Sequence, residues 1–228
     1  GVIDQRRIAA PAERIIVLKL RRLNQQAALP EVGQHELVRI LDEHARPLGL
    51  LGQAALRIDQ LHKRQVVFAA HARVVLAEGR RALAELGIDQ WQNGYPNENT
   101  LREDIQNKIC RVVIDDENNI LASAAVYVGD EPTYHEIYNG AWQTENKIYG
   151  IVHRIMAANN AKKRGAASFL MTYCAKLSLE AGVTSMRCDT HPGNIIMQHT
   201  LEKNGYIRCG IIHLTDGADR FAYEKVLK

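Results

Sequence analysis

Residues 148–177 read IYGIVHRIMAANNAKKRGAASFLMTYCAKL, and this stretch decides the fold. Its first part, Ile148–Ala157, is rich in residues that favour strands, which predicts a β-strand. Over Ala166–Leu177 the apolar residues recur at intervals of three and four, which predicts a helix. The loop that joins them contains Lys162, Lys163, Arg164 and Gly165. The stretch therefore predicts a strand, a basic loop and a helix.

The beginning of this predicted helix has the features of a phosphate-binding site. Amides in the first turn of a helix have no intrahelical partner, and the helix dipole is positive there. The small residues Gly165, Ala166 and Ala167 would let a phosphate approach the backbone, while the loop adds positive charge. A basic loop before a helix is also typical of an ordinary solvated cap. On spacing alone, both interpretations stay open.

Two helices are predicted upstream of this stretch. Leucines spaced seven and three apart predict a helix over residues 72–86, although Gly79 lies inside it, and Gly87 is suited to its C-terminal cap. Thr100 and Glu103 have the spacing of a capping box, which predicts that a second helix starts there.

Strands account for much of the remaining sequence. Two β-rich runs, 109–114 and 120–128, are separated by a polar turn and predict a hairpin. Asn194 is predicted to cap another helix, and further strands are predicted at 185–189, 206–213 and 221–227. The predicted order is therefore β-β-β-α-β-α-β-β after two helices, which few folds share.

The composition excludes several classes of protein. The 228 residues are 46% hydrophobic, with 29 Lys and Arg against 26 Asp and Glu, as in soluble globular proteins of one or two domains. No apolar run approaches the roughly 20 residues that cross a bilayer, and no signal peptide is evident. We therefore expect a cytoplasmic protein with no membrane partner. The four cysteines form no C-x-x-C pair, so we expect buried free thiols and no metal site.

The first 90 residues differ in composition from the rest. They contain 12 Arg, 2 Lys and one aromatic residue, whereas residues 91–228 contain 7 Arg, 8 Lys and 12 aromatic residues. Residues 14–23 favour a strand, and the apolar spacing within Pro30–Arg64 predicts two short amphipathic helices. Basic residues on such helices are compatible with DNA binding, but solvated helix faces have the same pattern. The small net charge of +3 argues against a nucleic-acid partner.

The later part of the chain resembles the GNAT superfamily of N-acetyltransferases. The resemblance lies in a linked series of segments over residues 72–228, among them Ile151–Ala157, Arg164-Gly165-Ala166-Ala167, Asp189-Thr-His191, Gly205-Tyr206, and Gly94-Tyr95-Pro96 after the first helix. It implies an α/β fold with a mixed, mostly antiparallel central sheet flanked by helices. We expect the acetyltransferase domain at residues 65–228, after an extra N-terminal segment, residues 1–64, of unknown role.

The resemblance also implies acetyl-CoA as the donor and a primary amine, on a small molecule or a peptide, as the acceptor. It assigns donor binding to the end of the strand, to the loop and helix start, and to one later residue. These residues are Ile155, Met156, Ala157, Lys162, Lys163, Arg164, Gly165, Ala166, Ala167 and Asn194. A homodimer is compatible with the resemblance, and no metal is required.

The sequence departs from the family pattern at three points. Lys162 stands where the family usually has Arg or Gln, so the charge is kept while the planar guanidinium is lost. Leu201 stands where many members have a Tyr that protonates the departing thiolate, which leaves water or another Tyr for that role. Members also open with a strand directly before the first helix, for which the candidates are Gln65–Ala69 and Ile15–Leu20.

Candidates for the chemistry can be named from residue type alone. The amine must lose a proton to attack the thioester, and Glu136, His135, His153 and His191 are candidate bases, although such histidines are more often exposed or held in a core. Aromatic candidates for the acceptor pocket, with core packing as the alternative, are Trp91, Tyr95, Tyr138 and Trp142. Because Leu201 removes a proton donor, a noncatalytic acyl-CoA-binding regulatory module stays open as an alternative function.

Overall fold

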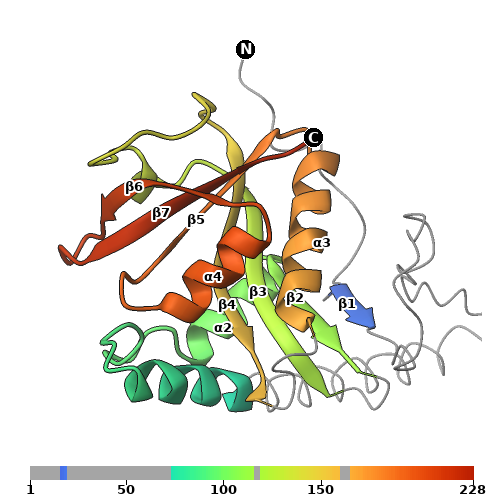
Figure 1. The fold of residues 1–228 in the computed structure, drawn as a ribbon. Coiled ribbons are helices and arrows are strands. Elements are labelled where there is room, and N and C mark those ends of the chain that lie inside the picture. Colours follow the sequence, from blue (N-terminus) through green and yellow to red (C-terminus); the bar gives the residue numbers. More distant parts are fainter. Residues whose placement is uncertain (1–15, 20–72, 116–118, 160–164) are drawn as a thin grey trace, which may run out of the picture.

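The computed structural model describes residues 16–19, 73–115, 119–159 and 165–228. Its seven-stranded sheet has the order β1-β2-β3-β4-β5-β7-β6 (Figure 1). The strands are β1 (Ile16–Lys19), β2 (Cys110–Ile114), β3 (Ile120–Gly129), β4 (Tyr149–Ala157), β5 (Ser185–Thr190), β6 (Ile207–His213) and β7 (Asp219–Val226). Residues 73–85 are helical, and the other helices are α2 (Glu98–Gln106), α3 (Ala166–Glu180), α4 (Ile195–Lys203) and the short 3-10 helix η2 (Pro132–Tyr134). The predicted α/β class and order of elements are confirmed.

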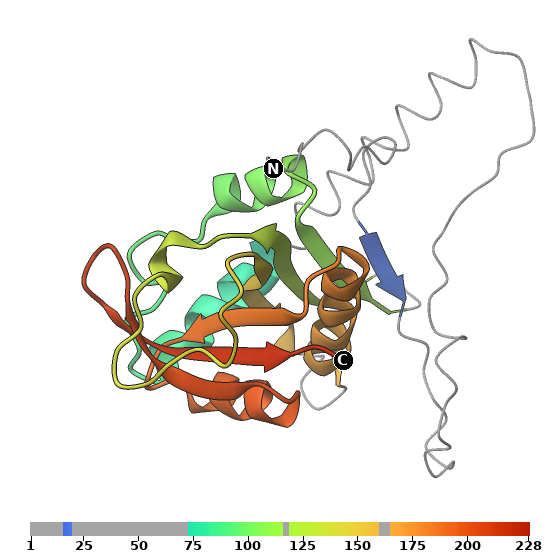
Figure 2. The same cartoon turned by 90° about the horizontal axis from the view of Figure 1, so that it is seen from above.

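Antiparallel pairing dominates the sheet, as predicted. Strands β2, β3 and β4 form one antiparallel unit, and β5, β7 and β6 form another. The two units meet where β4 pairs with β5 in parallel, and β1 pairs in parallel with β2 at the edge. Viewed from above, α3 and α4 lie on one side of the sheet and α2 lies on the other (Figure 2). The helices therefore flank the sheet as expected.

The N-terminal predictions are covered only in part by the described residues. β1 lies within the run Ile15–Leu20, one of the two candidates for an opening strand, and it joins the sheet beside β2. The other candidate, Gln65–Ala69, and the two helices predicted within Pro30–Arg64 lie outside the described residues. The boundary between residues 64 and 65 stays a prediction.

The predicted cap of α2 is wrong by one turn. The N-cap is Asn97, whose Oδ1 accepts a hydrogen bond from the Thr100 amide at 3.1 Å, while the Thr100 hydroxyl accepts from the Asn97 amide at 3.2 Å. Asparagine is a stronger N-cap than threonine, so Thr100 takes the reciprocal position of the box instead of starting it. By contrast, Asn194 caps α4 as predicted, accepting from the Met197 amide at 3.1 Å.

The core confirms the prediction for the cysteines and shows where three other residues lie. All four cysteines are buried free thiols. Leu201 is fully buried in the main core, and Tyr206 packs there just before β6. Gly79 also has a clear role, because a Cβ at this position would lie 3.1 Å from the Trp91 ring. The glycine in the helix of residues 73–85 thus makes room for Trp91 beside it.

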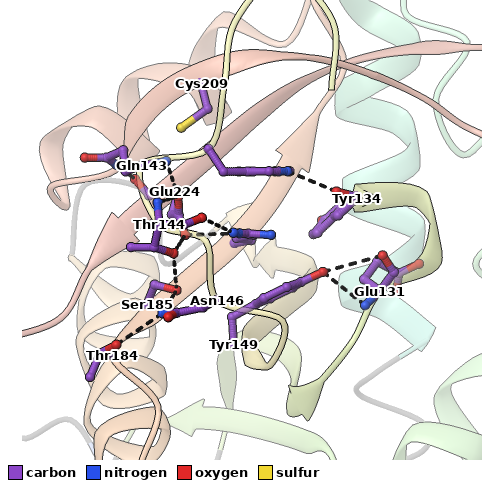
Figure 3. Close-up of polar contacts among 12 residues, drawn as sticks. Glu131, Tyr134, Gln143, Thr144, Asn146, Tyr149, Thr184, Ser185, Cys209 and Glu224 are labelled. Atoms are coloured by element: carbon purple, nitrogen blue, oxygen red, sulfur yellow. Dashed lines mark hydrogen bonds and ion pairs between the residues drawn. The ribbon is translucent and has the colours of Figure 1, made fainter. Parts of the chain in front are cut away.

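The connection between β3 and β4, residues 130–148, is fastened to the sheet by Glu224 of β7 (Figure 3). The fully buried Glu224 carboxylate accepts hydrogen bonds from the amides of Gln143 (2.5 Å) and Thr144 (3.1 Å) and from the Thr144 hydroxyl (2.6 Å). Arg187 Nε donates to the same carboxylate at 3.0 Å. Nearer the start of the connection, the Glu131 amide donates to the Tyr149 hydroxyl at 3.1 Å. These contacts fix the segment that carries Glu131.

Candidate active site

The candidate site is a cleft of about 930 Å³ that opens between β4 and β5. These parallel strands are paired only at Gly150 with Met186 and at Ile151 with Arg187, after which they diverge. Residues 152–157 of β4 line the cleft. Because no strand in the described part of the chain pairs with this edge of β4 beyond Ile151, its backbone groups are available to a ligand.

A bulge in β4 shapes this edge. Ser123 and Ala125 of β3 pair with Met156 and His153, so β4 has one more residue than β3 between these pairs. Arg154, inside the bulge, has a φ of 54°. Its guanidinium binds the buried carboxylate of Asp104 in α2 through two hydrogen bonds of 2.8 and 2.6 Å, which holds the bulge in place. The cleft-lining residues Ile155 and Met156 follow directly.

The N-terminus of α3 forms one end of the cleft. Gly165 is the N-cap, with a φ of 77° and no side-chain cap, and residues 165–168 line the cleft. Lys203 of α4 also lines it, and the neighbouring Asn204 contacts Ser168 at 3.1 Å, so the end of α4 lies beside the start of α3. This end combines free helix amides with a cation, which suits an anionic ligand.

The structure brings together most of the residues expected to bind the donor. Within the described part of the chain, Ile155, Met156, Ala157, Gly165, Ala166, Ala167 and Asn194 all line the one cleft. The loop residues Lys162, Lys163 and Arg164 lie outside the described residues. Their assignment to phosphate binding stays a prediction.

Two carboxylates and a histidine gather toward the other end of the cleft. His153 of β4 places Nε2 at 3.5 Å from Oε2 of Glu131 and Nδ1 at 3.9 Å from Oδ1 of Asp189 in β5. All three side chains are largely buried and line the cleft. Nε2 is fully buried and makes no hydrogen bond of normal geometry. The ring therefore lies between two acidic groups.

Tyrosines fix both carboxylates. The Tyr127 hydroxyl donates to Glu131 at 2.8 Å, and the Tyr134 hydroxyl donates to Asp189 at 2.7 Å. The facing His153 ring, aided by Tyr127, lowers the pKa of Glu131 to about 2 against the opposing effect of burial. Burial raises the pKa of both tyrosines. Near neutral pH, Glu131 is therefore an ionised partner for His153 and too weak a base to take a proton itself.

Of the residues expected to supply the base or the acceptor pocket, Trp91, Tyr95 and His153 line the cleft. Tyr95 also accepts a hydrogen bond on its hydroxyl from Arg154 Nη1 at 2.8 Å, which ties it to the bulge. These three are brought together with the residues expected to bind the donor.

The other candidates lie elsewhere. Glu136 and Tyr138 border a separate hollow of about 250 Å³ and hydrogen-bond to each other at 2.6 Å. Trp142 packs on Tyr134, and the Arg187 guanidinium lies 4.3 Å from its ring centre. The structure does not bring these residues into the cleft.

His191 is held by its own turn. Its Nδ1 accepts the Gly193 amide at 2.9 Å, and its Nε2 lies 3.4 Å from Asp89. Burial, with the nearby charge of Arg220, lowers its pKa. Both ring nitrogens already have a neighbour, and the residue does not line the cleft.

Sequence reasoning missed Glu131 and the pocket role of Asp189. Glu131 lies two residues after the end of the long apolar strand β3, a position where a polar side chain often reaches a sheet edge. Asp189 was singled out only as part of a segment shared with the family. Their joint role becomes visible once β3, β4 and β5 are placed side by side.

The described residues contain no candidate for a metal centre or a membrane span. No group of three or more His, Cys, Asp and Glu side chains there is placed to hold a metal ion. No helix in the described ranges is both long enough and apolar enough to cross a membrane.

Comparisons with known proteins agree with this geometry. A model of the acetyltransferase (GNAT) family matches residues 80–206. The crystal structure of a GNAT-family acetyltransferase from Streptococcus agalactiae 2603 is 34% identical in sequence, with a TM-score of 0.61, and the match covers 80% of this chain and 94% of that one. A GNAT-family acetyltransferase from Listeria monocytogenes 4b F2365 shares the fold at 16% identity and a TM-score of 0.51, covering 67% and 86%. No curated protein matches the sequence.

The matched region contains the cleft-forming strands β4 and β5 and the start of α3. It covers more than half of the chain, and the Streptococcus structure extends the likeness over most of the remainder. The resemblance seen in the sequence is thereby confirmed. The chain belongs to the acetyltransferase (GNAT) family.

Proposed function

We propose that this protein transfers the acetyl group of acetyl-CoA to a primary amine by direct attack on the thioester. The main support for the proposal is that the two ends of a single cleft differ in chemistry. The α3 N-terminus suits the pyrophosphate at one end, and His153 between Glu131 and Asp189 suits a reacting amine at the other. The unpaired edge of β4 runs between them.

The reaction needs little from side chains. The amine nitrogen attacks the carbonyl carbon, and a backbone amide of the unpaired β4 edge is suited to donate to the developing oxyanion. The amine proton passes to His153, whose imidazolium is stabilised by ionised Glu131. The C–S bond then breaks, and the thiolate takes a proton from water, since Leu201 is buried in the core and provides no hydroxyl. The proton held by His153 neutralises the hydroxide that remains, which restores the neutral imidazole.

Donor binding is tested at Gly165. Gly165→Asp is expected to weaken acetyl-CoA binding, measured by calorimetry, about 100-fold, because a carboxylate about 5 Å from the pyrophosphate costs about 3 kcal/mol at an effective dielectric of about 20. Gly165→Asn is the matched control, since asparagine has the same shape, tolerates a φ of 77° and carries no charge. A Cβ at this position meets no described atom within 4 Å. Equal losses in both variants, or no binding by the unaltered protein, would contradict the assignment.

The second candidate function is a noncatalytic acyl-CoA-binding module, favoured by the missing hydroxyl at Leu201. Release of CoA thiol from acetyl-CoA in the presence of a panel of primary amines separates the two. We expect amine-dependent thiol release together with an equal amount of N-acetylated product. Tight acetyl-CoA binding without any turnover across the panel would instead support the binding module.

A further inference from the structure

Arg220 of β7 is a buried cation that faces the cleft without an acidic partner. The residue is 7% exposed and lines the cleft. Among the described residues, no carboxylate lies within ion-pair distance of its guanidinium, and its hydrogen bonding is limited to Nη1 donating to the Asp219 carbonyl oxygen at 2.7 Å. Most of its donor capacity is therefore unused.

Two other arginines near the cleft differ in this respect. Arg154 binds Asp104 through two hydrogen bonds, and Arg187 binds Glu224. Burial of a charged group is unfavourable unless an opposite charge compensates it. A guanidinium that is buried, unpaired and directed at a cleft therefore indicates an anionic group on the ligand.

The sheet places Arg220 beside the acidic end of the cleft. Asp189 of β5 pairs with Ala222 of β7, and Arg220 is two residues before Ala222. Residues two apart on a strand point to the same face, and a diagonal pair of this kind lies about 7–8 Å apart. The reacting end thus presents a carboxylate that neighbours His153 and, next to it, a free cation.

We propose that Arg220 binds a carboxylate of the acceptor, so that the acceptor is an amino acid or a close analogue. The inference rests on the proposed acetyl transfer. The planar guanidinium accommodates a carboxylate through paired hydrogen bonds. A single positive charge also matches a carboxylate better than a phosphate dianion, whose second charge would lie unneutralised near Asp189 and Glu131. The amine of the same molecule then reaches His153.

The kinetic test compares amino acids with their carboxamides in the native protein and in Arg220→Gln. The native protein is expected to favour the free carboxylate, and Arg220→Gln to lower kcat/KM for the acids about 10- to 100-fold, the range of a lost charge-assisted hydrogen bond. Values for the amides should change less than about threefold. Acetyl-CoA affinity should be unchanged, because Arg220 lies away from the α3 end.

A binding measurement tests carboxylate recognition by Arg220 without requiring any catalytic turnover. N-acetyl amino acids and their amides are titrated by calorimetry into the protein saturated with CoA, with thermal unfolding as the folding control for Arg220→Gln. If the acids bind in preference to the amides and this preference is lost in Arg220→Gln, Arg220 is supported as the carboxylate-binding residue. This conclusion holds even if no amine is acetylated; only the proposed function then fails. Equal binding of acids and amides, no binding of either, or an equal loss for both in the variant overturns the proposal.

Discussion

Glu224→Ala is expected to lower the free energy of unfolding by about 3–5 kcal/mol, the usual cost of removing one partner of a buried ion pair. The Glu224 side chain is 0% exposed, and its loss would leave the Arg187 guanidinium buried and without its acidic partner. It would also remove the acceptor for the Gln143 and Thr144 amides that fasten the connection between β3 and β4. Denaturant unfolding measures the change.

The chain offers a matched control for this substitution. Glu136 lies on the same connection but is exposed and hydrogen-bonds to Tyr138, so Glu136→Ala should change stability by less than about 0.5 kcal/mol. Glu224→Gln and Arg187→Gln, combined in a double-mutant cycle, should cost less together than the sum of the two. A loss below about 1 kcal/mol for Glu224→Ala would show that the network does not hold the connection.

The fold was predictable because its signals are local. The strand, loop and helix over residues 148–177 were readable from apolar spacing, and the hairpin from two β-rich runs around a polar turn. The cap of α2 failed for an equally local reason, since Asn97 competes with Thr100 for the N-cap position. Features formed by residues that are close together in the chain can be predicted from the local sequence pattern.

The contacts at the reacting end of the cleft cannot be predicted from such local patterns, because they join residues that are far apart in the chain. Tyr134 and Asp189 are 55 residues apart, and Arg154 and Asp104 are 50 apart, yet each pair is in hydrogen-bond contact. The bulge in β4 and the divergence of β4 from β5 depend on strand pairing that spacing does not encode. Sequence spacing therefore does not distinguish His153 from His191 as a candidate base. In the assembled sheet only His153 of the two lines the cleft.

His153→Gln is expected to lower kcat/KM for amine acetylation about 100- to 1000-fold, within the range of about 100- to 10,000-fold that general acid–base catalysis contributes. The Glu131 carboxylate faces Nε2, and its pKa of about 2 keeps it ionised while the ring holds the amine proton. Initial-rate kinetics at one fixed pH measure kcat/KM in the native protein and in the variant.

His135→Gln is the control, because His135 is exposed, pairs with Asp130 at 2.7 Å and lies outside the cleft. It should retain near-native kcat/KM. Acetyl-CoA affinity should be native in both variants, since neither residue belongs to the α3 end. Near-native kcat/KM in His153→Gln would remove His153 from the chemistry. The cleft would then act by positioning alone, with water taking the proton from the amine.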